Sequence, residues 1–299
     1  MLSKKKILVV GSEGMLGSAL VARLKEERLK DKTFELFAAD ELDCDITDHE
    51  EMLLYVMSIA PNLIINCAAY TDVDGAESHA PEAYLVNGDG PKNLAEACYN
   101  CGTRLIHMST EYVFDGTKGT PYVETDEPRP LSEYGKSKLR GEKNIGIFLQ
   151  NYLILRTSWL FGPRGKNFID TVLRLANERE EIKMVADQSG APTYTVDLAD
   201  GICRLIHSEI TGIYNLAGAD YCTWYELAQY VLDVAGRKAR MTPIDTAHLD
   251  RPAKRPLNCR LDCSKIEREA EIRLRPWRET VAEYIKKYTM KSSSSGNLP

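Results

Sequence analysis

The sequence lacks any apolar run long enough to cross a membrane, which would need about 18 consecutive apolar residues. Its lysine-rich start is followed by an uninterrupted apolar run only from Ile7 to Val10, whereas the apolar region of a secretory signal has roughly 7–15 residues. An excess of positive charge is also missing, because 38 Lys and Arg stand against 44 Asp and Glu, a net charge of −6 without a basic stripe. We therefore expect a soluble, cytoplasmic protein without nucleic-acid or membrane partners.

Cysteine is present, but not in a pattern typical of metal sites or disulfide frameworks. The only close pairs among the eight cysteines are Cys98 with Cys101 and Cys259 with Cys263. Their spacings are unequal and the two pairs are far apart in the chain, which argues against a zinc site. Cys67 lies within an apolar run, as a small core residue does. We expect no metal and no disulfides.

The sequence is rich in apolar runs that alternate with helical patterns. Strands are expected at 5–11, 33–40, 61–69, 103–110 and 152–162. Helices are expected at 15–27, at 46–60 with Thr47 or Asp48 as N-cap, at 80–100 with a Gly/Pro interruption, and after residue 130. Several runs are apolar on both faces, which suits a parallel sheet covered by helices on both sides. The predicted fold is therefore α/β, a doubly wound Rossmann sheet.

The later part of the chain predicts a smaller substrate domain. Helices are expected at 166–180, 195–207, 223–236 and 276–288, with a late strand at 212–218. We assign residues 1–160 and about 193–218 to a dinucleotide-binding domain, and 161–192 and 219–290 to the substrate domain. The Ser-rich end, 291–299, is expected to be disordered. Ligands should bind between the two domains.

Three glycines follow the first strand and precede the first helix. Gly11, Gly14 and Gly17 form the pattern G-x-x-G-x-x-G in this strand–turn–helix context, where it becomes informative. Glycine permits the tight turn and a close approach of backbone to a pyrophosphate, and the helix N-terminus offers unpaired N–H groups. The loop predicts dinucleotide binding.

Acidic residues follow the second strand. Asp40 ends this strand, where a carboxylate can accept hydrogen bonds from adenosine ribose hydroxyls, which favours NAD over NADP. Asp43 and Asp45 follow closely, so the assignment within the group stays open, and Asp45 with Ile46 could flank the adenine instead.

A second group of polar residues is expected at the same edge of the sheet. Tyr134 and Lys138 stand four apart and so share one face of the helix that follows the fourth strand. Thr110 ends that strand, and the carboxyl ends of parallel strands bring their residues to the edge where the glycine loop lies. Tyr134 and Lys138 could be two ordinary helix residues, but their surroundings favour an active site.

Longer strings carry a family resemblance along nearly the whole chain. They include GSEGMLG, NCAAYTDVDGAE, STEYVFDGTKGTPYVETD, YGKSKLRGEKN, LRTSWLFG and DQSGAPTYTVDLAD. The chain resembles the extended short-chain dehydrogenase/reductase superfamily, and within it the dTDP-4-dehydrorhamnose reductases. The resemblance implies that NADH or NADPH reduces the 4-keto group of a dTDP-sugar, converting dTDP-4-dehydro-L-rhamnose to dTDP-L-rhamnose.

The resemblance also implies roles for individual residues. The catalytic set would be Thr110, Tyr134 and Lys138. The cofactor would be contacted by Gly14, Met15 and Leu16 at its phosphates, and further along by Ala69, Tyr70, Thr71 and Met108. Glu111 and Trp159 would contact the sugar nucleotide.

The sequence departs from the family pattern at several positions. Glu111 stands where aspartate is usual, and Gly75 where many relatives have lysine. Ala19 and Val196 stand where acidic residues of a magnesium-dependent dimer would be expected, so no metal is carried over. The chain could be a monomer or a homodimer.

The chemistry gives each catalytic residue a physical reason. Hydride addition to a ketone leaves negative charge on the oxygen, and Tyr134 can supply the proton. Free tyrosine has a pKa of about 10, and a cation about 4 Å away can lower it by up to roughly three units. We therefore expect Lys138 to lower the pKa of Tyr134 and to bind the nicotinamide ribose. Thr110 can hydrogen-bond the carbonyl oxygen.

Other readings stay open. A related reductase would give the 6-deoxytalose epimer with the same residues, and a regulatory subunit of the methionine adenosyltransferase β type could share the fold without turnover. A 4,6-dehydratase would have an Asp-Glu pair after the threonine, where Glu111 and Tyr112 stand. Arg251 and Arg255 could bind a diphosphate or lie at the surface. Asn87 is more typical of a helix cap, although it could also reach the site.

Overall fold

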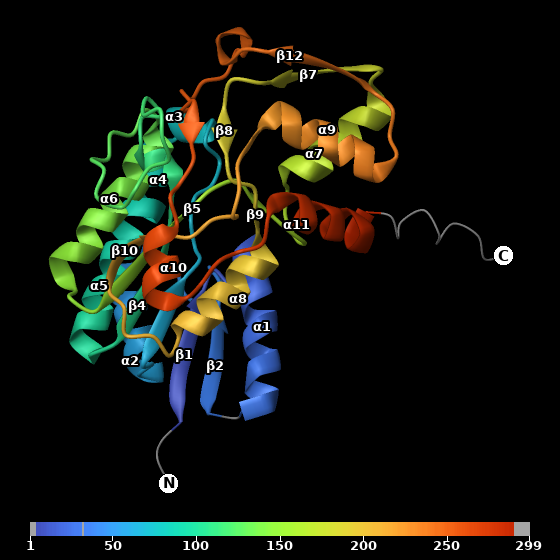
Figure 1. Cartoon of the computed structure of the whole chain (residues 1–299). Helices are drawn as coiled ribbons and strands as arrows, with labels where there is room; N and C mark the ends of the chain where they lie inside the picture. The colour runs from blue at the N-terminus through green and yellow to red at the C-terminus, as the bar shows by residue number, and fades with distance from the viewer. Residues whose placement is uncertain (1–3, 32, 290–299) are drawn as a thin grey trace.

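The central element of the computed structural model, which describes residues 4–31 and 33–289, is a parallel sheet of six strands (Figure 1). The strands are β1 (Lys5–Val10), β2 (Phe34–Ala39), β3 (Leu63–Asn66), β4 (Arg104–Thr110), β5 (Tyr152–Thr157) and β10 (Gly212–Asn215). Their order is β10-β5-β4-β3-β1-β2, and every neighbouring pair is parallel. The chain reverses its direction of travel across the sheet between β1 and β3, the place where ligands bind in such folds. The predicted doubly wound fold is confirmed.

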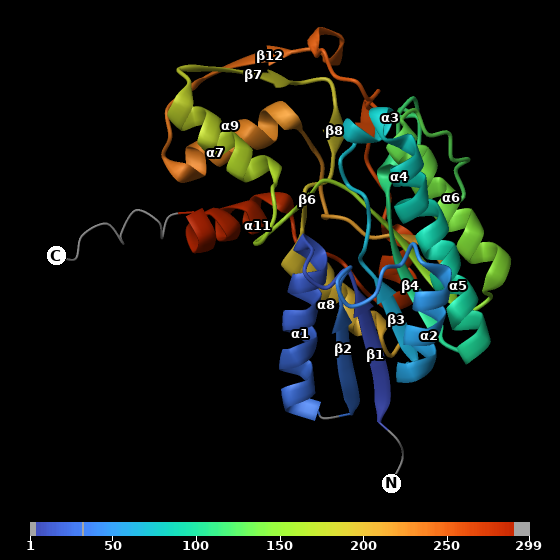
Figure 2. The ribbon, with the colours of Figure 1, turned by 180° about the vertical axis from the view of Figure 1, so that it is seen from behind.

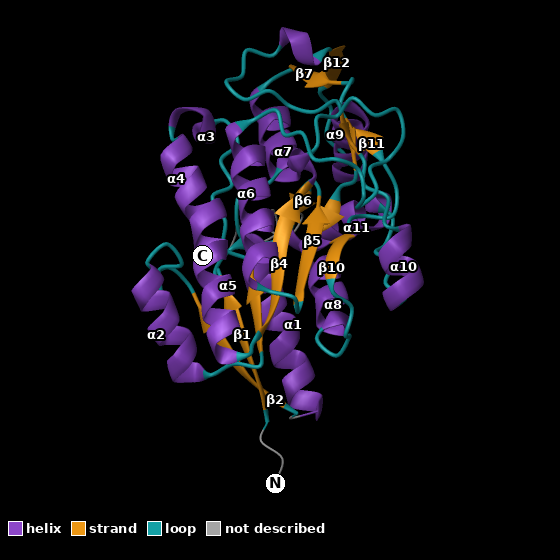
Figure 3. Ribbon diagram, turned by 90° about the vertical axis from the view of Figure 1, so that its left-hand side faces the viewer, coloured by secondary structure: helices purple, strands orange, loops and turns teal. Residues whose placement is uncertain are grey.

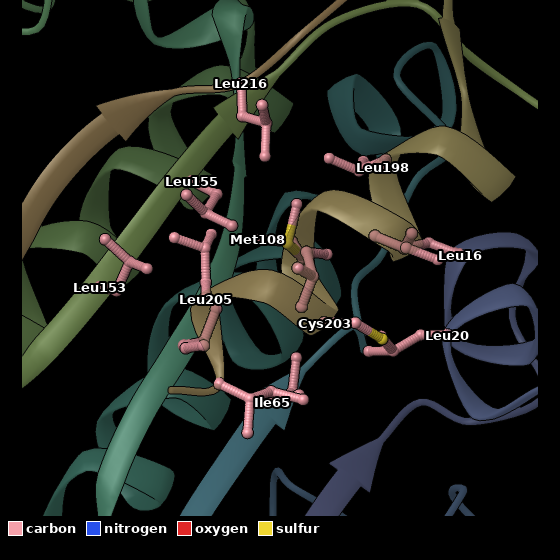
Figure 4. Packing of buried hydrophobic residues seen from close by; sticks show 14 of the residues in the cluster. Leu16, Leu20, Ile65, Met108, Leu153, Leu155, Leu198, Cys203, Leu205 and Leu216 are labelled. Carbon is pink, nitrogen blue, oxygen red and sulfur yellow. The ribbon is translucent and has the colours of Figure 1, made fainter. Parts of the chain in front are cut away.

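Helices cover both faces of this sheet (Figures 2 and 3). On one face lie α1 (Met15–Asp31) and α8 (Thr195–Leu205), and on the other α2 (His49–Ile59), α5 (Gly90–Cys101) and α6 (Glu133–Phe148). Successive residues of β1 alternate between the two cores: Ile7 lies in the first core, and Leu8 in the second. Figure 4 shows the first core, where Leu16 and Leu20 of α1 meet the strands and α8. Burial on both faces explains the unbroken apolar runs of the strands.

Side-chain caps define where several helices begin. Asp48 is the N-cap of α2 and accepts a hydrogen bond from the Glu51 N–H, which decides between the two predicted candidates. Ser132 caps α6 by accepting from the Gly135 N–H. Thr223 forms a capping box with Glu226 at the start of α9 (Trp224–Ala235).

The helix expected at 80–100 is interrupted more deeply than predicted. It consists of α4 (Ala80–Tyr84), the π-helical turn η1 (Leu85–Asp89) and α5, and the short α3 (Gly75–Ser78) precedes it. Asn87 lies buried within the π turn. The prediction that Asn87 caps a helix was wrong, because its side chain binds the backbone of a different loop, as described below.

The second half of the chain builds a separate apolar core. It lies among α7 (Phe168–Glu178), α9 and α11 (Trp277–Tyr284), and includes the fully buried Trp277. The run expected as one strand at 152–162 divides into β5 and β6 (Leu160–Phe161). Short strands and turns not expected from the sequence are β7 (Glu181–Val185), β8 (Ser189–Gly190), β9 (Thr193–Tyr194), β11 (Cys222–Thr223), β12 (Arg240–Ile244), β13 (Asn258–Cys259), η2 (Glu111–Val113), η3 (Thr246–His248) and η4 (Ile285–Thr289). Helix α10 (Ser264–Ala270) was also not expected, and its Ile266 joins the first core.

Three further observations concern the described residues. All eight cysteines are free. No helix within residues 4–31 and 33–289 is long and apolar enough to span a bilayer, and no group of three or more His, Cys, Asp or Glu there could bind a metal ion. The tail at 291–299, expected to be disordered, lies outside the described residues.

Candidate active site

The glycine loop packs so tightly that side chains are excluded at two of its positions. Gly11 has φ of +73°, and a Cβ on it would lie 2.5 Å from the Ala68 amide nitrogen. A Cβ on Gly17 would lie 1.9 Å from the Gly11 carbonyl oxygen. Gly14 is less confined, since a Cβ there would be 3.4 Å from the same oxygen. The turn therefore brings the start of α1, with Met15 and Leu16, against the end of β1.

Asp40 lies at this loop, as expected. Its Oδ2 accepts a hydrogen bond from the Glu13 N–H at 2.7 Å, and its Oδ1 accepts one from the Glu41 N–H at 2.8 Å. Asp45 Oδ1 instead accepts from the Thr47 N–H at 2.8 Å. Ile46 packs on α5, where a Cβ on Gly90 would lie 2.6 Å from its Cδ1. Asp40 is thus joined directly to the glycine loop, whereas Asp45 and Ile46 lie further along the same edge.

Asn87 fixes the loop that follows β3. Its Oδ1 accepts from the Tyr70 N–H, and its Nδ2 donates to the Tyr70 carbonyl and to Ser137 Oγ, all at 3.0 Å. The segment Ala69–Thr71 is therefore attached to α6, the helix of Tyr134 and Lys138. The sequence alone does not reveal this role, because the residues that Asn87 binds lie 17 and 50 positions away in the chain.

The structure brings Thr110, Tyr134 and Lys138 together at the end of β4. Thr110 lies beside the Tyr134 hydroxyl and lowers the pKa of this phenol, and Thr110 Oγ1 donates to Glu111 Oε2 at 2.8 Å. Lys138 Nζ donates to the Met108 carbonyl at 2.7 Å. All three residues of the predicted catalytic set, together with Met108 and Glu111, thus lie in one connected group.

Burial controls the electrostatics of this group, in part against expectation. The prediction that Lys138 lowers the pKa of Tyr134 was wrong. Burial, and then the Glu111 carboxylate, raise the pKa of Tyr134, and the neighbouring Thr110 only partly opposes them. Lys138 Nζ is directed to the Met108 carbonyl instead. Burial lowers the pKa of Lys138 to about 8 and raises the pKa of Glu111 to about 8.

Aromatic side chains lie near this group. Trp159, with φ of +46°, stacks on Trp224 with ring centroids 3.5 Å apart. A Cβ on Gly190 would lie 2.4 Å from Trp159 Cε2, so glycine is required beneath the indole. Tyr112 meets Tyr134 edge to face at 5.5 Å. The pKa of the Cys259 thiol is raised first by burial and then by Glu111, and is lowered by Trp159, so the predicted substrate-contact residues Trp159 and Glu111 both lie near this cysteine.

The two late-loop arginines bind a carboxylate of the protein itself. Arg255 forms a forked ion pair with Asp74, with Nη1 to Oδ1 at 2.9 Å and Nη2 to Oδ2 at 2.8 Å. Arg251 Nη1 contacts Asp74 Oδ2 at 2.9 Å. These bonds lower the pKa of Asp74 to about 2, and they join the loop before α3 to the loop before β13.

The positions that depart from the family pattern are confined or apolar in this chain. A Cβ on Gly75 would lie 2.5 Å from Asp72 Oδ2, so this position is crowded. Ala19 packs against the first core of the sheet, and Val196 against the core among α7, α9 and α11.

The comparison with known proteins identifies the family. A family model described as "RmlD substrate binding domain" matches residues 5–290. The chain belongs to this family. An RmlD-family relative named dTDP-4-dehydrorhamnose reductase, from Sinorhizobium fredii, is 37% identical over 291 residues, covering 94% of this chain and 96% of the relative. The family resemblance read from the sequence is thereby confirmed.

Solved structures of the RmlD type superpose closely on the chain. The crystal structure of a dTDP-4-dehydrorhamnose reductase from Clostridium acetobutylicum has a TM-score of 0.88 at 39% identity, covering 94% of this chain and 98% of that one. The enzyme of that name from Bacillus anthracis, solved in complex with NADP, has a TM-score of 0.89 at 35% identity, with coverages of 95% and 99%.

Proposed function

We propose that this protein uses NADH or NADPH to reduce the 4-keto group of dTDP-4-dehydro-L-rhamnose, giving dTDP-L-rhamnose. The observation that carries the proposal is the meeting of Thr110, Tyr134 and Lys138 at the sheet edge that also has the glycine loop. Membership of the RmlD family and relatives named for this reaction support it.

The residues present fit a nicotinamide dinucleotide. The close packing of Gly11 and Gly17 brings the start of α1 against the end of β1, and the N–H groups at a helix N-terminus can bind a pyrophosphate. In the proposal Gly14, Met15 and Leu16 contact the phosphates and Asp40 the adenosine ribose. The nicotinamide end lies along the segment Ala69–Thr71 and Met108, with Lys138 at its ribose. When bound, the cofactor supplies the hydride.

Proton transfer falls to Tyr134. Because burial raises its pKa, the phenol is neutral at pH 7 and has its proton ready for the developing alkoxide. In the proposal Thr110 turns its hydroxyl hydrogen from Glu111 to the carbonyl oxygen of the substrate and so fixes that oxygen beside the phenol. Lys138, with a pKa of about 8, is mostly charged at pH 7 and in the proposal binds the nicotinamide ribose.

Substrate binding is assigned to Glu111 and Trp159. With a pKa of about 8, Glu111 is mostly a neutral carboxylic acid at pH 7, so it can donate a hydrogen bond to a sugar oxygen as well as accept one. The indole of Trp159 is only partly buried although it stacks on Trp224, and its exposed part offers apolar surface to the deoxysugar.

The division of labour between two lobes is part of the proposal. Residues 1–160 with about 193–218 would bind the dinucleotide, and 161–192 with 219–290 the sugar nucleotide. The separate core among α7, α9 and α11 supports this division. In the proposal the protein is cytoplasmic, is a monomer or a homodimer, and needs no metal.

The experiment is turnover of dTDP-4-dehydro-L-rhamnose generated in situ, with NADH and NADPH in parallel and the product identified by NMR. Formation of dTDP-L-rhamnose is expected. The 6-deoxytalose epimer as product would transfer the assignment to a related 4-keto reductase. Cofactor binding without turnover of this substrate would contradict the proposal and favour a regulatory subunit.

A further inference from the structure

A buried carboxylate lies one helical turn beyond Lys138. Glu142 follows Lys138 by four residues on α6 and so lies on the same helix face. Its side chain is almost fully buried, as is that of Arg156 on β5. A buried ion pair is a poor source of stability, because desolvation offsets its attraction, so the presence of this pair beside the site calls for another reason.

Both oxygens of Glu142 are occupied by groups from the sheet. Oε1 accepts from Ser109 Oγ at 2.5 Å and from Arg156 Nε at 2.9 Å, and Oε2 accepts from Arg156 Nη2 at 2.6 Å. The guanidinium lies 5.0 Å from the Phe114 ring centroid, so its position is constrained from that side as well. Glu142 thus connects α6 to β4 through Ser109 and to β5 through Arg156.

Ser109, one of the residues that Glu142 binds, adjoins two groups of the proposed catalytic set, Lys138 and Thr110. Ser109 lies between Met108, whose carbonyl binds Lys138 Nζ at 2.7 Å, and Thr110. A displacement of Ser109 would therefore move both the carbonyl that binds Lys138 and the hydroxyl beside Tyr134. Glu142 sets the spacing between strand and helix at the place where the site depends on it.

The titratable and charged groups around Lys138 come from four parts of the fold. Cys67 follows β3, and burial raises the pKa of its thiol to about 12. His107 on β4 has a pKa lowered well below its usual value by burial and by Lys138. Both are therefore neutral at pH 7, and Arg156 on β5 lies beyond Glu142. Glu142 is the one carboxylate among the described residues that raises the pKa of Lys138 against the effect of burial.

We propose that Glu142 is a positioning residue of the reductase, which with Ser109 and Arg156 fixes Lys138 relative to Thr110 and keeps the Lys138 ammonium charged. The inference rests on the proposed function for its catalytic meaning. The charge state of Lys138 that it predicts can be measured without turnover.

The test is a titration of Lys138 in the whole protein, with ¹³Cε-labelled lysine observed by NMR and the Lys138 signal assigned by its loss in Lys138→Met. We expect a Lys138 midpoint near 8 in the wild type and a midpoint lower by about one pH unit or more in Glu142→Gln, the size of effect that a nearby opposite charge has. Arg156→Lys is the matched control, since it weakens the fork but keeps the carboxylate, and its midpoint should stay within a few tenths of a unit of the wild type.

An unchanged Lys138 midpoint in folded Glu142→Gln would overturn the inference. If this variant does not fold, Glu142→Gln combined with Arg156→Gln leaves no uncompensated charge. A smaller fall of the midpoint is expected of it, because the more distant Arg156 cation is removed together with the carboxylate, and an unchanged midpoint would overturn the inference. A lowered midpoint in a protein without reductase turnover would leave the electrostatic role intact and contradict the proposed function alone.

Discussion

At the scale of single residues, burial sets the charge state of the site. Glu111, Tyr134 and Lys138 are all enclosed, and each has a pKa displaced toward its neutral form. A neutral Glu111 also removes the negative charge that would otherwise oppose ionisation of Tyr134. At pH 7 the site thus presents a neutral phenol and a mostly neutral carboxylic acid beside a mostly charged ammonium.

Glu111→Gln tests this picture through stability. The pKa of Glu111 is raised from 4.5 to about 8 in the folded protein, so the wild type loses stability as pH rises from about 5 to about 8, because the unfolded chain ionises first. The variant lacks this loss. Its free energy of unfolding relative to the wild type should increase over that range, by an amount on the order of a few kcal/mol. Urea unfolding at both ends of the range measures it.

The exposed Glu127, with 73% of its side chain accessible, provides the control. Glu127→Gln should show no comparable dependence on pH. An equal pH dependence in the two variants would contradict the burial of Glu111 as the cause.

Which residues could be found from the sequence depends on whether their neighbours in space are also near in sequence. Thr110, Tyr134 and Lys138 were placed correctly because a strand end and a four-residue helical spacing fix them. Asn87 and Glu142 were not, because the groups they bind come from other strands and helices. The pKa of Tyr134 was predicted in the wrong direction, since a spacing does not reveal which atom Lys138 Nζ contacts.

At the scale of elements, the glycine loop is the most constrained connection. Gly17→Ala would place a Cβ 1.9 Å from the Gly11 carbonyl, so we expect it to destabilise the protein by about 1–3 kcal/mol and to weaken cofactor binding. This sign is the reverse of the usual effect of alanine in a helix. Thermal unfolding and cofactor titration measure the two effects.

Gly14→Ala is the matched control, because its Cβ would meet the same oxygen at 3.4 Å, an ordinary contact. Its stability should differ from the wild type by only a few tenths of a kcal/mol. Equal stability of the two variants would show that the loop is looser than described.

Long periodic elements were predictable from the sequence, and short ones were not. The six sheet strands and the main helices were found because the length of each allows its apolar pattern to be recognised. Strands of two residues, such as β8 and β13, have no pattern of their own and form only because larger elements bring them together. The helix α10, with seven residues, was not predicted because it too is short for a recognisable apolar pattern.

At the scale of the whole molecule, Asp74 connects the two halves of the chain. It lies before α3 and binds Arg251 and Arg255 near β13, about 180 positions away. The pKa of Asp74 is lowered to about 2 by Arg255 and Arg251. Its contribution is therefore present above its unfolded pKa of 3.8 and is lost as pH falls toward about 2.

Asp74→Asn should lower the free energy of unfolding at pH 7 by about 1 kcal/mol, and the difference from the wild type should vanish as pH falls from about 4 to about 2. Chemical unfolding across that range tests both parts. Glu178→Gln removes an exposed ion pair within α7 alone and should have a smaller effect. A pH-independent difference for Asp74→Asn would contradict the ion pairs as its source.

The most direct test of the whole account is the rate of dTDP-4-dehydro-L-rhamnose reduction by Tyr134→Phe. The account predicts a loss of about 10²–10⁴-fold in turnover with nicotinamide binding retained, because the proton donor alone is removed. Tyr99→Phe, the same chemical change at an exposed tyrosine of α5, should turn over like the wild type. Full activity in Tyr134→Phe, or an equal loss in both variants, would contradict the account.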